Sequence, residues 1–400
     1  MRILLLGNGF DLYHKFPTRY DNFLHTVDFL QQNYDEKTML TIGDIFGDQR
    51  LLEKDSFIPE CYAKHKEAYN EITVDQEKIK KIISLSEDNI WFKYFLSVYN
   101  KELGWIDFER EISKVLYAFE EFFLCYGNVY DITFPKYDVY EYIIKRFDFF
   151  YEYTDVAVDA SGRIYDTNSD TVLDDYQLEE PYGSKIIIIN KAKIIDKLYD
   201  ELLKLSEILR IYLDVFINNA ITIIFEKGLV PKTSLFKNDP TVITFNYTNT
   251  FETLYSGTKV RHLHGNTSDK IILGVNPDDN DEFDSKNDVH TDFLRFKKYY
   301  QRVLNATDIG YLNCINQAKE HIEIFSGNWL VVAGHSLDVT DEDIIKEVFS
   351  VSNEITIVCH SEKSIADSIN NLIRIYGKKE FDNIRARRNM RFKLYSDFEQ

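Results

Sequence analysis

Short apolar runs that end in turn-forming residues lie near both ends of the chain. The first run, Arg2–Leu6, is followed at once by Gly7-Asn8-Gly9 and polar residues, a pattern typical of a buried strand that leads into a loop. Similar runs follow Pro240, at Thr241–Phe245, Val260–Leu263, Ile271–Leu273, Trp329–Ala333 and Glu354–Val358. Segments with helical spacing separate several of them, at 292–325, 340–350 and 361–376. Strands that alternate with helices predict an α/β fold with a largely parallel sheet.

The middle of the chain instead has apolar residues at helical spacing, with charges between them. This pattern covers four segments, 77–99, 105–125, 136–153 and 184–227. The last of these has a single interruption, which we interpret as a turn or a kink. Residues 152–183 hold nine acids and one base, Arg163, so we expect an exposed acidic loop or a small hairpin there.

Together the two patterns predict one discontinuous domain and one insertion. Residues 1–30 and 236–400 are expected to form a Rossmann-like parallel sheet with its helices. Residues 31–235 are expected to be a large, mainly helical insertion. Near the first boundary, Thr18 and Asp21 have the spacing of a capping box, so a helix is expected to begin there.

Charge and apolar run length restrict the classes of partner. Asp and Glu outnumber Lys and Arg by 66 to 47, which gives a net charge of −19. A protein that grips nucleic acid needs a basic face, so nucleic acid is not expected as a partner. The N-terminal apolar run is too short for a signal peptide, and no stretch has the apolar length that spans a bilayer. We therefore expect a soluble, cytoplasmic protein without a membrane partner.

The cysteines do not have the spacing of a metal site. Cys61, Cys125, Cys314 and Cys359 are far apart and form no C-x-x-C pair, which excludes a zinc ribbon or finger. We expect them to be buried, reduced thiols, and we expect no bound metal.

Four loops follow predicted strands, where an α/β sheet collects its ligands. Gly7–Asp11 follows the first strand, and its glycines either let backbone N–H groups approach a phosphate or ribose or simply make a tight turn. Gly334–Asp338 follows the strand 329–333. Because Asp338 stands where a nucleophile elbow needs glycine, this turn fits a ribose or phosphate contact better than a serine hydrolase.

The other two loops carry the candidate catalytic groups. Thr244–Thr248 contains Asn246, whose amide could orient a water or hold a sugar hydroxyl, or could cap the next helix. His262 and His264 alternate along a predicted strand and should share a face. His264, followed by Gly265, is a candidate general base. A metal site with Asp338 as third ligand and a purely structural role for both histidines are the alternatives.

Taken in order, the motifs resemble those of the AbiH family of phage abortive-infection proteins. They are G-N-G-F-D-L from Gly7, F-P-T-R-Y-D-N-F from Phe16, W-I-D-F-E from Trp105, T-F-N-Y-T from Thr244, H-L-H-G from His262 and G-H-S-L-D-V-T-D from Gly334. The resemblance runs from residue 1 to about residue 350 and implies a role in defence against phage. Within W-I-D-F-E, Asp107 either caps a helix or, with Trp105 and Glu109, gates a pocket.

A more distant resemblance is to sirtuin-like domains that cleave NAD. It implies that NAD is the substrate and that Asn246 and His264 are catalytic. It also implies that NAD contacts a set of residues in the four loops, namely Gly7, Asn8, Gly9, Phe10, Asp11, Thr244, Gly334, His335 and Ser336. The chain departs from the sirtuin pattern at Asp11, which replaces a serine, and at Thr248, which replaces an aspartate.

These features lead to a main hypothesis and two alternatives. The main hypothesis is an abortive-infection effector that hydrolyses NAD at the nicotinamide–ribose bond, an NAD+ glycohydrolase activity. The first alternative, favoured by the departures at Asp11 and Thr248, is a nucleotide-binding sensor or interaction protein without catalysis. The second is a metal-dependent nuclease using His262 and His264, against which the net charge counts. The partners expected are NAD or a related nucleotide, a phage-derived trigger and a second copy of the chain.

Overall fold

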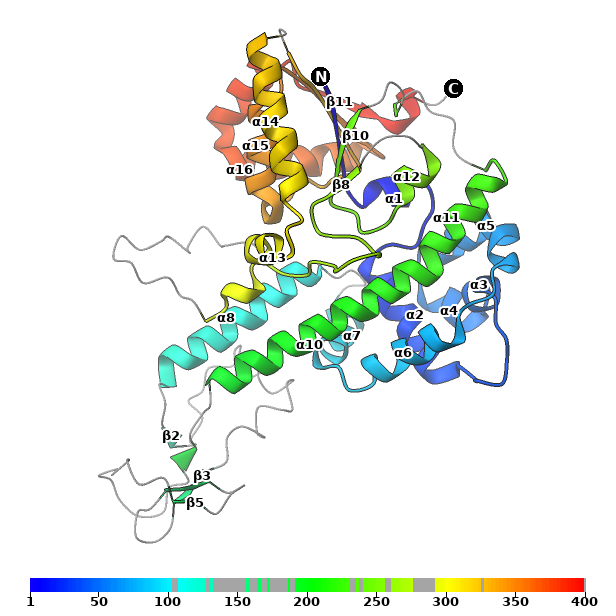
Figure 1. The fold of residues 1–400 in the computed structure, drawn as a ribbon, viewed down its shortest axis with the longest axis vertical. Helices are drawn as coiled ribbons and strands as arrows, with labels where there is room; N and C mark the ends of the chain where they lie inside the picture. The colour runs from blue at the N-terminus through cyan, green and yellow to red at the C-terminus, as the bar shows by residue number, and fades with distance from the viewer. Residues whose placement is uncertain are drawn as a thin grey trace. The chain divides into compact units, whose positions relative to one another are not determined.

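A six-stranded parallel sheet joins the two ends of the chain (Figure 1). Its strands are β1 (Arg2–Leu6), β7 (Thr241–Thr244), β8 (Val260–His262), β9 (Trp329–Ala333), β10 (Glu354–Cys359) and β11 (Arg391–Leu394). They lie in the order β11-β10-β9-β1-β7-β8, and every neighbouring pair is parallel. With the six strands numbered along the chain, this order reads 6-5-4-1-2-3, the order of the Rossmann fold. The predicted parallel α/β sheet is confirmed.

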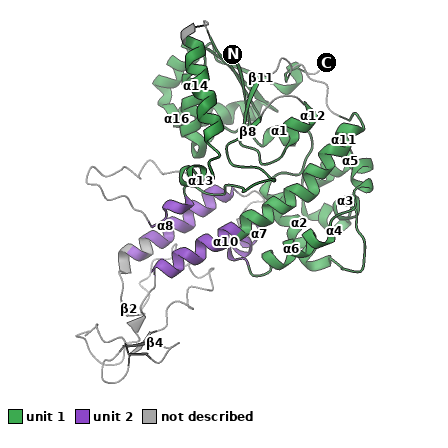
Figure 2. Ribbon diagram, viewed as in Figure 1, with its two compact units in different colours: residues 1–88, 204–278, 297–400 green, residues 89–203, 279–296 purple. Residues whose placement is uncertain are grey.

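The computed structural model describes most of the 400 residues. Residues outside the description are 103–106, 127–129, 132–155, 159–163, 167–170, 173–185, 188–190, 230–234, 237–239, 256–259, 276–291, 325–326 and 399–400. The chain divides into two compact units, shown in Figure 2. Unit 1 comprises residues 1–88, 204–278 and 297–400, and unit 2 comprises 89–203 and 279–296.

Strand β1 lies at the centre of the sheet because both of its faces are apolar. Its residues pair in register with β7 on one side and β9 on the other, so that Leu4 lies between Val242 and Val331. Ile3 and Leu5 belong to one core, and Leu4 and Leu6 belong to the other. All four side chains are at most 1% exposed, as expected for a strand covered on both faces.

Helices cover both faces of this sheet. One core contains residues of α14 (Ile309–Ile324), α15 (Glu342–Ser350) and α16 (Glu362–Arg387). The other contains residues of α1 (Gly9–Tyr13) and α12 (Thr250–Leu254). Figure 1 shows α14, α15 and α16 on one side of the strands and α1 and α12 on the other. The helices therefore cover the faces of the sheet, and loops lie at the ends of its strands.

The remaining helices lie in the middle of the sequence. Those of unit 1 are α2 (Tyr20–Asn33), α3 (Ile42–Phe46), α4 (Gln49–Lys54), α5 (Ile58–Glu71), α6 (Gln76–Ser86) and α13 (Lys298–Asn305). Unit 2 contains α7 (Ile90–Glu102) and α8 (Phe108–Tyr126). The single helix predicted over 77–99 is thus two helices, because Asn89 caps the second by accepting the Phe92 N–H.

One long helix runs through the predicted segment 184–227. It consists of α10 (Lys191–Tyr212), a π-helical turn at Leu213–Asn218 and α11 (Asn219–Glu226). The interruption expected from the sequence is therefore the π-helical turn. Contrary to our expectation, Lys191–Glu226 is long and apolar enough to cross a membrane by length and composition, but 67% of its most apolar window is buried inside the protein. This burial is consistent with a core helix of a soluble protein.

Several other predictions need correction. Ile271–Leu273 is buried but is not a strand; the Ile272 N–H donates instead to the carbonyl of His264. Helix α2 begins at Tyr20 rather than at Thr18, and the Asn22 side chain accepts the Arg19 N–H. The predicted helix over 136–153 lies outside the described residues. In the acidic segment, the described parts form antiparallel strands, β3 (Val156–Val158), β4 (Ile164–Asp166) and β5 (Thr171–Val172).

Candidate functional site

The loops after β1 and β9 lie against each other at the point where the strand order reverses. The Gly9 N–H donates to the Gly334 carbonyl at 2.7 Å. A Cβ on Gly334, where φ is +70°, would lie 2.1 Å from the Phe10 nitrogen, and one on Gly7 would lie 2.6 Å from the His335 Cα. Only glycine permits these close approaches. They bring two of the four candidate loops together at the topological switch point, where such sheets bind ligands.

Backbone N–H groups of the first loop donate hydrogen bonds to carbonyl groups of the protein itself. The Gly7 N–H donates to the Ala333 carbonyl, and the Phe10 N–H donates to the Gly7 carbonyl. The Asn8 side chain bonds Thr18 twice: its amide donates to the Thr18 carbonyl, and its oxygen accepts the Thr18 hydroxyl at 2.6 Å. The first two sequence motifs are thus tied to each other, and the Asn8 and Thr18 side chains hold the shape of the loop.

A buried polar cluster connects the first loop with the loop after β7. Asp11 is 1% exposed, and its Oδ2 accepts the Thr248 hydroxyl at 2.6 Å. Thr250 in turn donates to the Thr248 oxygen. Burial raises the pKa of Asp11 to about 6, against the opposing effect of the hydrogen bond from Thr248. The Oδ1 atoms of Asp11 and of Asn246 are both buried without a hydrogen-bond partner among the described residues. The cluster therefore has unused acceptors.

His264 lies in a buried charged cluster at the same edge of the sheet. Its Nε2 is 3.6 Å from Asp341 Oδ1, and Lys298 Nζ is 2.9 Å from the same oxygen. His264 is 3% exposed and Lys298 is fully buried. Burial, and then the charge on Lys298, hold the pKa of His264 well below its ordinary value, so the ring is neutral at pH 7. A neutral imidazole has an unprotonated nitrogen and can accept a proton.

His335 joins this cluster from the loop after β9. Its Nδ1 accepts the Leu337 N–H, so the neutral ring carries its proton on Nε2, 3.3 Å from Asp341 Oδ2. Burial alone would raise the pKa of Asp341, but Lys298 and His335 outweigh it and hold that pKa well below its ordinary value. Phe245 packs on both histidines, with ring centroids 4.3 Å from His335 and 5.2 Å from His264. Asp341 is therefore an ionised carboxylate that pairs with Lys298 and His335 and faces His264.

The two histidines of H-L-H-G have different partners. His262 Nδ1 lies 2.8 Å from the Asn246 carbonyl, and its Nε2 lies 2.6 Å from Glu252. His262 thus fixes the loop that carries Asn246, while His264 belongs to the Asp341 cluster. Among the described residues, no three His, Cys, Asp or Glu side chains are placed to hold a metal ion. The Asp341 carboxylate is paired with the Lys298 ammonium in the position that a metal ion would take.

The other predicted site residues have local roles. The Thr244 hydroxyl accepts the Asn246 N–H. The Ser336 carbonyl accepts the Asn371 amide, and Asp338 caps the next turn by accepting the Thr340 N–H. In unit 2, Asp107 accepts the N–H groups of Glu109 and Arg110 at the start of α8, which confirms that it caps this helix.

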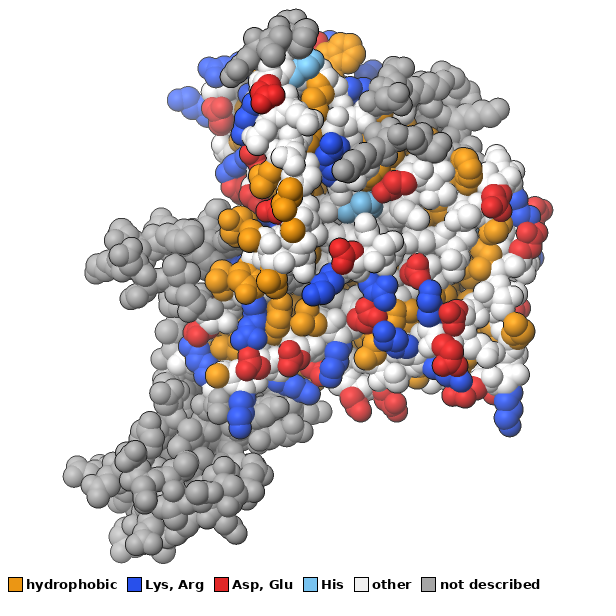
Figure 3. Space-filling model, viewed as in Figure 1, with side chains coloured by type: hydrophobic (Ala, Val, Ile, Leu, Met, Phe, Trp, Pro, Cys, Tyr) orange, Lys and Arg blue, Asp and Glu red, His pale blue; other side chains and the backbone are white. Residues whose placement is uncertain are grey.

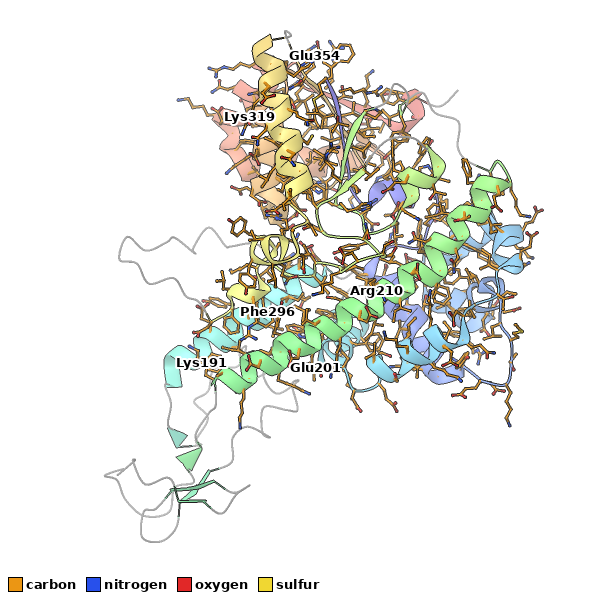
Figure 4. All side chains as sticks on the ribbon, viewed as in Figure 1. Lys191, Glu201, Arg210, Phe296, Lys319 and Glu354 are labelled. Atoms are coloured by element: carbon orange, nitrogen blue, oxygen red, sulfur yellow. The ribbon has the colours of Figure 1, made fainter. Side chains whose placement is uncertain are left out.

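The loop after His264 is anchored on the long helix. Arg210, labelled on α10 in Figure 4, donates to the Thr267 carbonyl at 2.8 Å. Asn218 donates to the Thr267 hydroxyl at 2.5 Å, and the Thr267 N–H donates to the Tyr247 carbonyl. The loops after β7 and β8 are thus held together from both sides.

Sequence reasoning did not find the buried cations of this site. Lys298 and Arg302 lie one turn apart on α13, and both are at most 2% exposed. Arg302 pairs with Asp343, and its Nη1 is buried without a hydrogen-bond partner among the described residues. The signal in the sequence was weak, namely two basic residues at i and i+4 on a predicted helix and three acids at 341–343.

The surface in Figure 3 carries side chains of both charges. Over α6 and the neighbouring part of α10, Lys and Arg are intermixed with Asp and Glu, and Lys81 and Arg210 both pair with Glu207. Basic side chains in this region therefore have acidic partners. Apolar side chains gather over α13 and the start of α14, where Tyr299, Leu304 and Ile309 are 61%, 62% and 56% exposed.

The fold and the site define an α/β protein of Rossmann-like strand order with buried polar clusters at its switch point. A family model described as bacteriophage abortive infection AbiH matches residues 3–360. The chain therefore belongs to the AbiH family of phage abortive-infection proteins. No curated protein and no solved structure matches it at a significant level.

Proposed function

We propose that this AbiH protein is a cytoplasmic effector that hydrolyses NAD at the nicotinamide–ribose bond during phage infection. Membership of the family supports the role in abortive infection. The observation that carries the proposed chemistry is the placement of a neutral, buried His264 and of Asn246 on neighbouring loops at the switch point. A sirtuin-like origin of these loops would account for the same placement.

The proposed reaction breaks one bond and forms one. The ribose C1′–nitrogen bond breaks, and its electron pair stays on the pyridine nitrogen, which turns the cationic ring into neutral nicotinamide. A water oxygen then bonds C1′ of the oxocarbenium-like ribose, and the water proton passes to the unprotonated nitrogen of His264. The products are nicotinamide, ADP-ribose and one proton, which His264 later releases to solvent.

The polar cluster would position the reactants. The unpartnered Asn246 Oδ1 can accept a hydrogen bond from a ribose hydroxyl or from the attacking water. Asp11 Oδ1 offers a second acceptor beside it. Oxygens at this position favour the developing positive charge on the ribose more strongly than they favour the substrate, which is the requirement for lowering the barrier.

Burial of the site supports a protein that is inactive until infection. Asn246 is 7% exposed and His264 is 3% exposed, so a dinucleotide reaches them only after the covering residues move. A phage-derived trigger that stabilises an open state would supply this movement. Binding to one of two states can shift the balance between them only by the difference in affinity.

The test compares cells that carry the wild type with cells that carry His264→Ala or Asn246→Ala. Both changes should abolish protection against phage together with NAD loss, because general base catalysis contributes roughly 10²–10⁴ in rate. His321→Ala is the matched control, since His321 lies beside the Met1 amino group at the opposite edge of the sheet. Thermal unfolding of the purified variants checks that the fold is kept. Protection by both variants, or constant NAD while the wild type protects, would refute the catalytic role.

The Asp11–Thr248 hydrogen bond favours a second candidate function, a sensor that binds a nucleotide without cleaving it. It occupies one oxygen of the Asp11 carboxylate, and so it fixes that side chain for binding rather than for proton transfer. In this case the wild type would bind NAD and protect cells while the NAD concentration stays constant. The same experiment therefore separates the two functions.

A further inference from the structure

A cavity of about 230 Å³ lies in unit 1, beside the segment that follows β1. Its walls come from the end of α1 and the turn after it, from α5, from α11 and the turn after it, and from α12. The lining residues are Tyr13, His14, Lys15, Phe16, Lys64, His65, Ile224, Leu229 and Leu254. It includes none of the residues of the Asn246 and His264 clusters.

The inner wall of the cavity is apolar. Phe16 and Leu254 are 0% and 6% exposed, and Ile224 is 1% exposed. Toward the surface, Lys64 and Leu229 are exposed, with Leu229 at 41%. An apolar cavity of about 150 Å³ holds a benzene molecule in another protein, so this one has room for a ring and a small substituent.

The two lining histidines are neutral. His14 Nδ1 donates to the Phe10 carbonyl, and its Nε2 accepts the Tyr255 hydroxyl. His65 Nε2 donates to the His14 carbonyl, while its Nδ1 is buried without a hydrogen-bond partner among the described residues. Burial lowers the pKa of both rings to about 4. The positive charge at the cavity therefore comes from Lys15 and Lys64.

We propose that this cavity binds a small organic anion, a carboxylate or phosphate attached to an apolar ring or short chain. The apolar wall would take the ring, and the lysines would face the anionic group. Lys15 already pairs with Glu60 at 2.7 Å, so Lys64 supplies most of the unbalanced charge. In a protein with a net charge of −19, Lys64 beside an apolar cavity gives a local positive charge that favours an anion at this place.

Such a ligand would act on the loop that carries Asp11. His14 and Tyr13 end the short helix that begins at Gly9, and the His14 ring is bonded to the carbonyl of Phe10. A ligand packed on His14 and Phe16 would stabilise this helix in the conformation described here. The ligand would therefore favour the state of the protein in which the Asn246 and His264 clusters are buried.

The test uses two probes with nearly the same ring and opposite charge, benzoate and benzylamine. Ligand-observed NMR with the full-length protein should show saturable binding of benzoate and none of benzylamine. Lys64→Glu should weaken benzoate binding about tenfold, which corresponds to about 1.4 kcal/mol. Lys66→Glu, an exposed lysine on the same helix that does not line the cavity, is the matched control and should bind like the wild type.

A second variant tests the cavity itself. Leu254→Trp places a larger side chain in the space and should abolish benzoate binding, provided that its unfolding temperature shows that the protein is folded. If Leu254→Trp does not fold, the pair Lys64→Glu and Lys66→Glu decides. Equal binding of benzoate and benzylamine, or equal weakening by the two lysine changes, would overturn the proposal. Activity on NAD plays no part in this result.

Discussion

Replacing Asp341 by asparagine should destabilise the protein strongly. The Asp341 carboxylate is 2.9 Å from the ammonium of Lys298, which is fully buried. Asparagine keeps the shape of the side chain but removes its charge, and the buried ammonium then loses its carboxylate. Breaking a buried ion pair by removing one partner costs about 3–5 kcal/mol of the free energy of unfolding.

The double variant Asp341→Asn/Lys298→Met shows whether this cost comes from the pair. Methionine has nearly the volume of lysine and leaves no buried charge, so the double variant should recover most of the loss. Urea unfolding of the wild type, Asp341→Asn, Lys298→Met and the double variant gives the four free energies. It is followed through hydrogen exchange of β9 and β1 amides so that unit 1 is measured. A loss below about 1 kcal/mol for Asp341→Asn, or additive losses in the double variant, would refute the reasoning.

Three further predictions concern the loops and the metal. Because the pKa of Asp11 is raised to about 6, its contribution to stability is present below pH 4 and is lost as the pH rises through 6. Asp11→Asn should remove this pH dependence and raise the free energy of unfolding at pH 7.5 by roughly 2–3 kcal/mol. An unchanged pH profile in urea unfolding would contradict this. Gly334→Ala should prevent folding, because the added Cβ would meet the Phe10 nitrogen. Gly228 also has a positive φ but has no atom within 4 Å of such a Cβ, so Gly228→Ala should lower the free energy of unfolding by only about 1 kcal/mol. Similar unfolding temperatures for the two variants would contradict the tight loop contact. Elemental analysis of the purified protein should find no stoichiometric zinc, and one tightly held zinc per chain would revive the nuclease alternative.

The central strands were predictable because their pattern is set locally. Arg2–Leu6 and Trp329–Ala333 are continuous apolar runs that end at glycine, and both are buried strands in the structure. Arg391–Leu394 was missed because it is an edge strand with exposed and half-buried residues in alternation. Ile271–Leu273 has the composition of a strand, but the Ile272 N–H donates to the His264 carbonyl eight positions earlier, and the segment is irregular backbone.

The site was predictable only where it follows the strands. The glycine turns and the polar residues just beyond them could be placed at one edge of the sheet by topology. The partners of those residues could not, because they depend on contacts far apart in the sequence. Lys298 is buried only because Asp341, 43 positions away, compensates its charge, and a basic residue on an amphipathic helix is otherwise expected to be exposed.

The central claim is that this site breaks the nicotinamide–ribose bond, and its most direct test is the chemical balance of NAD in infected cells. Mass spectrometry after phage infection should show NAD falling while nicotinamide and ADP-ribose rise in equal amounts in cells that carry the wild type. With His264→Ala the three concentrations should stay at their levels in uninfected cells. Loss of NAD without matching nicotinamide, or the same products from His264→Ala, would contradict the claim.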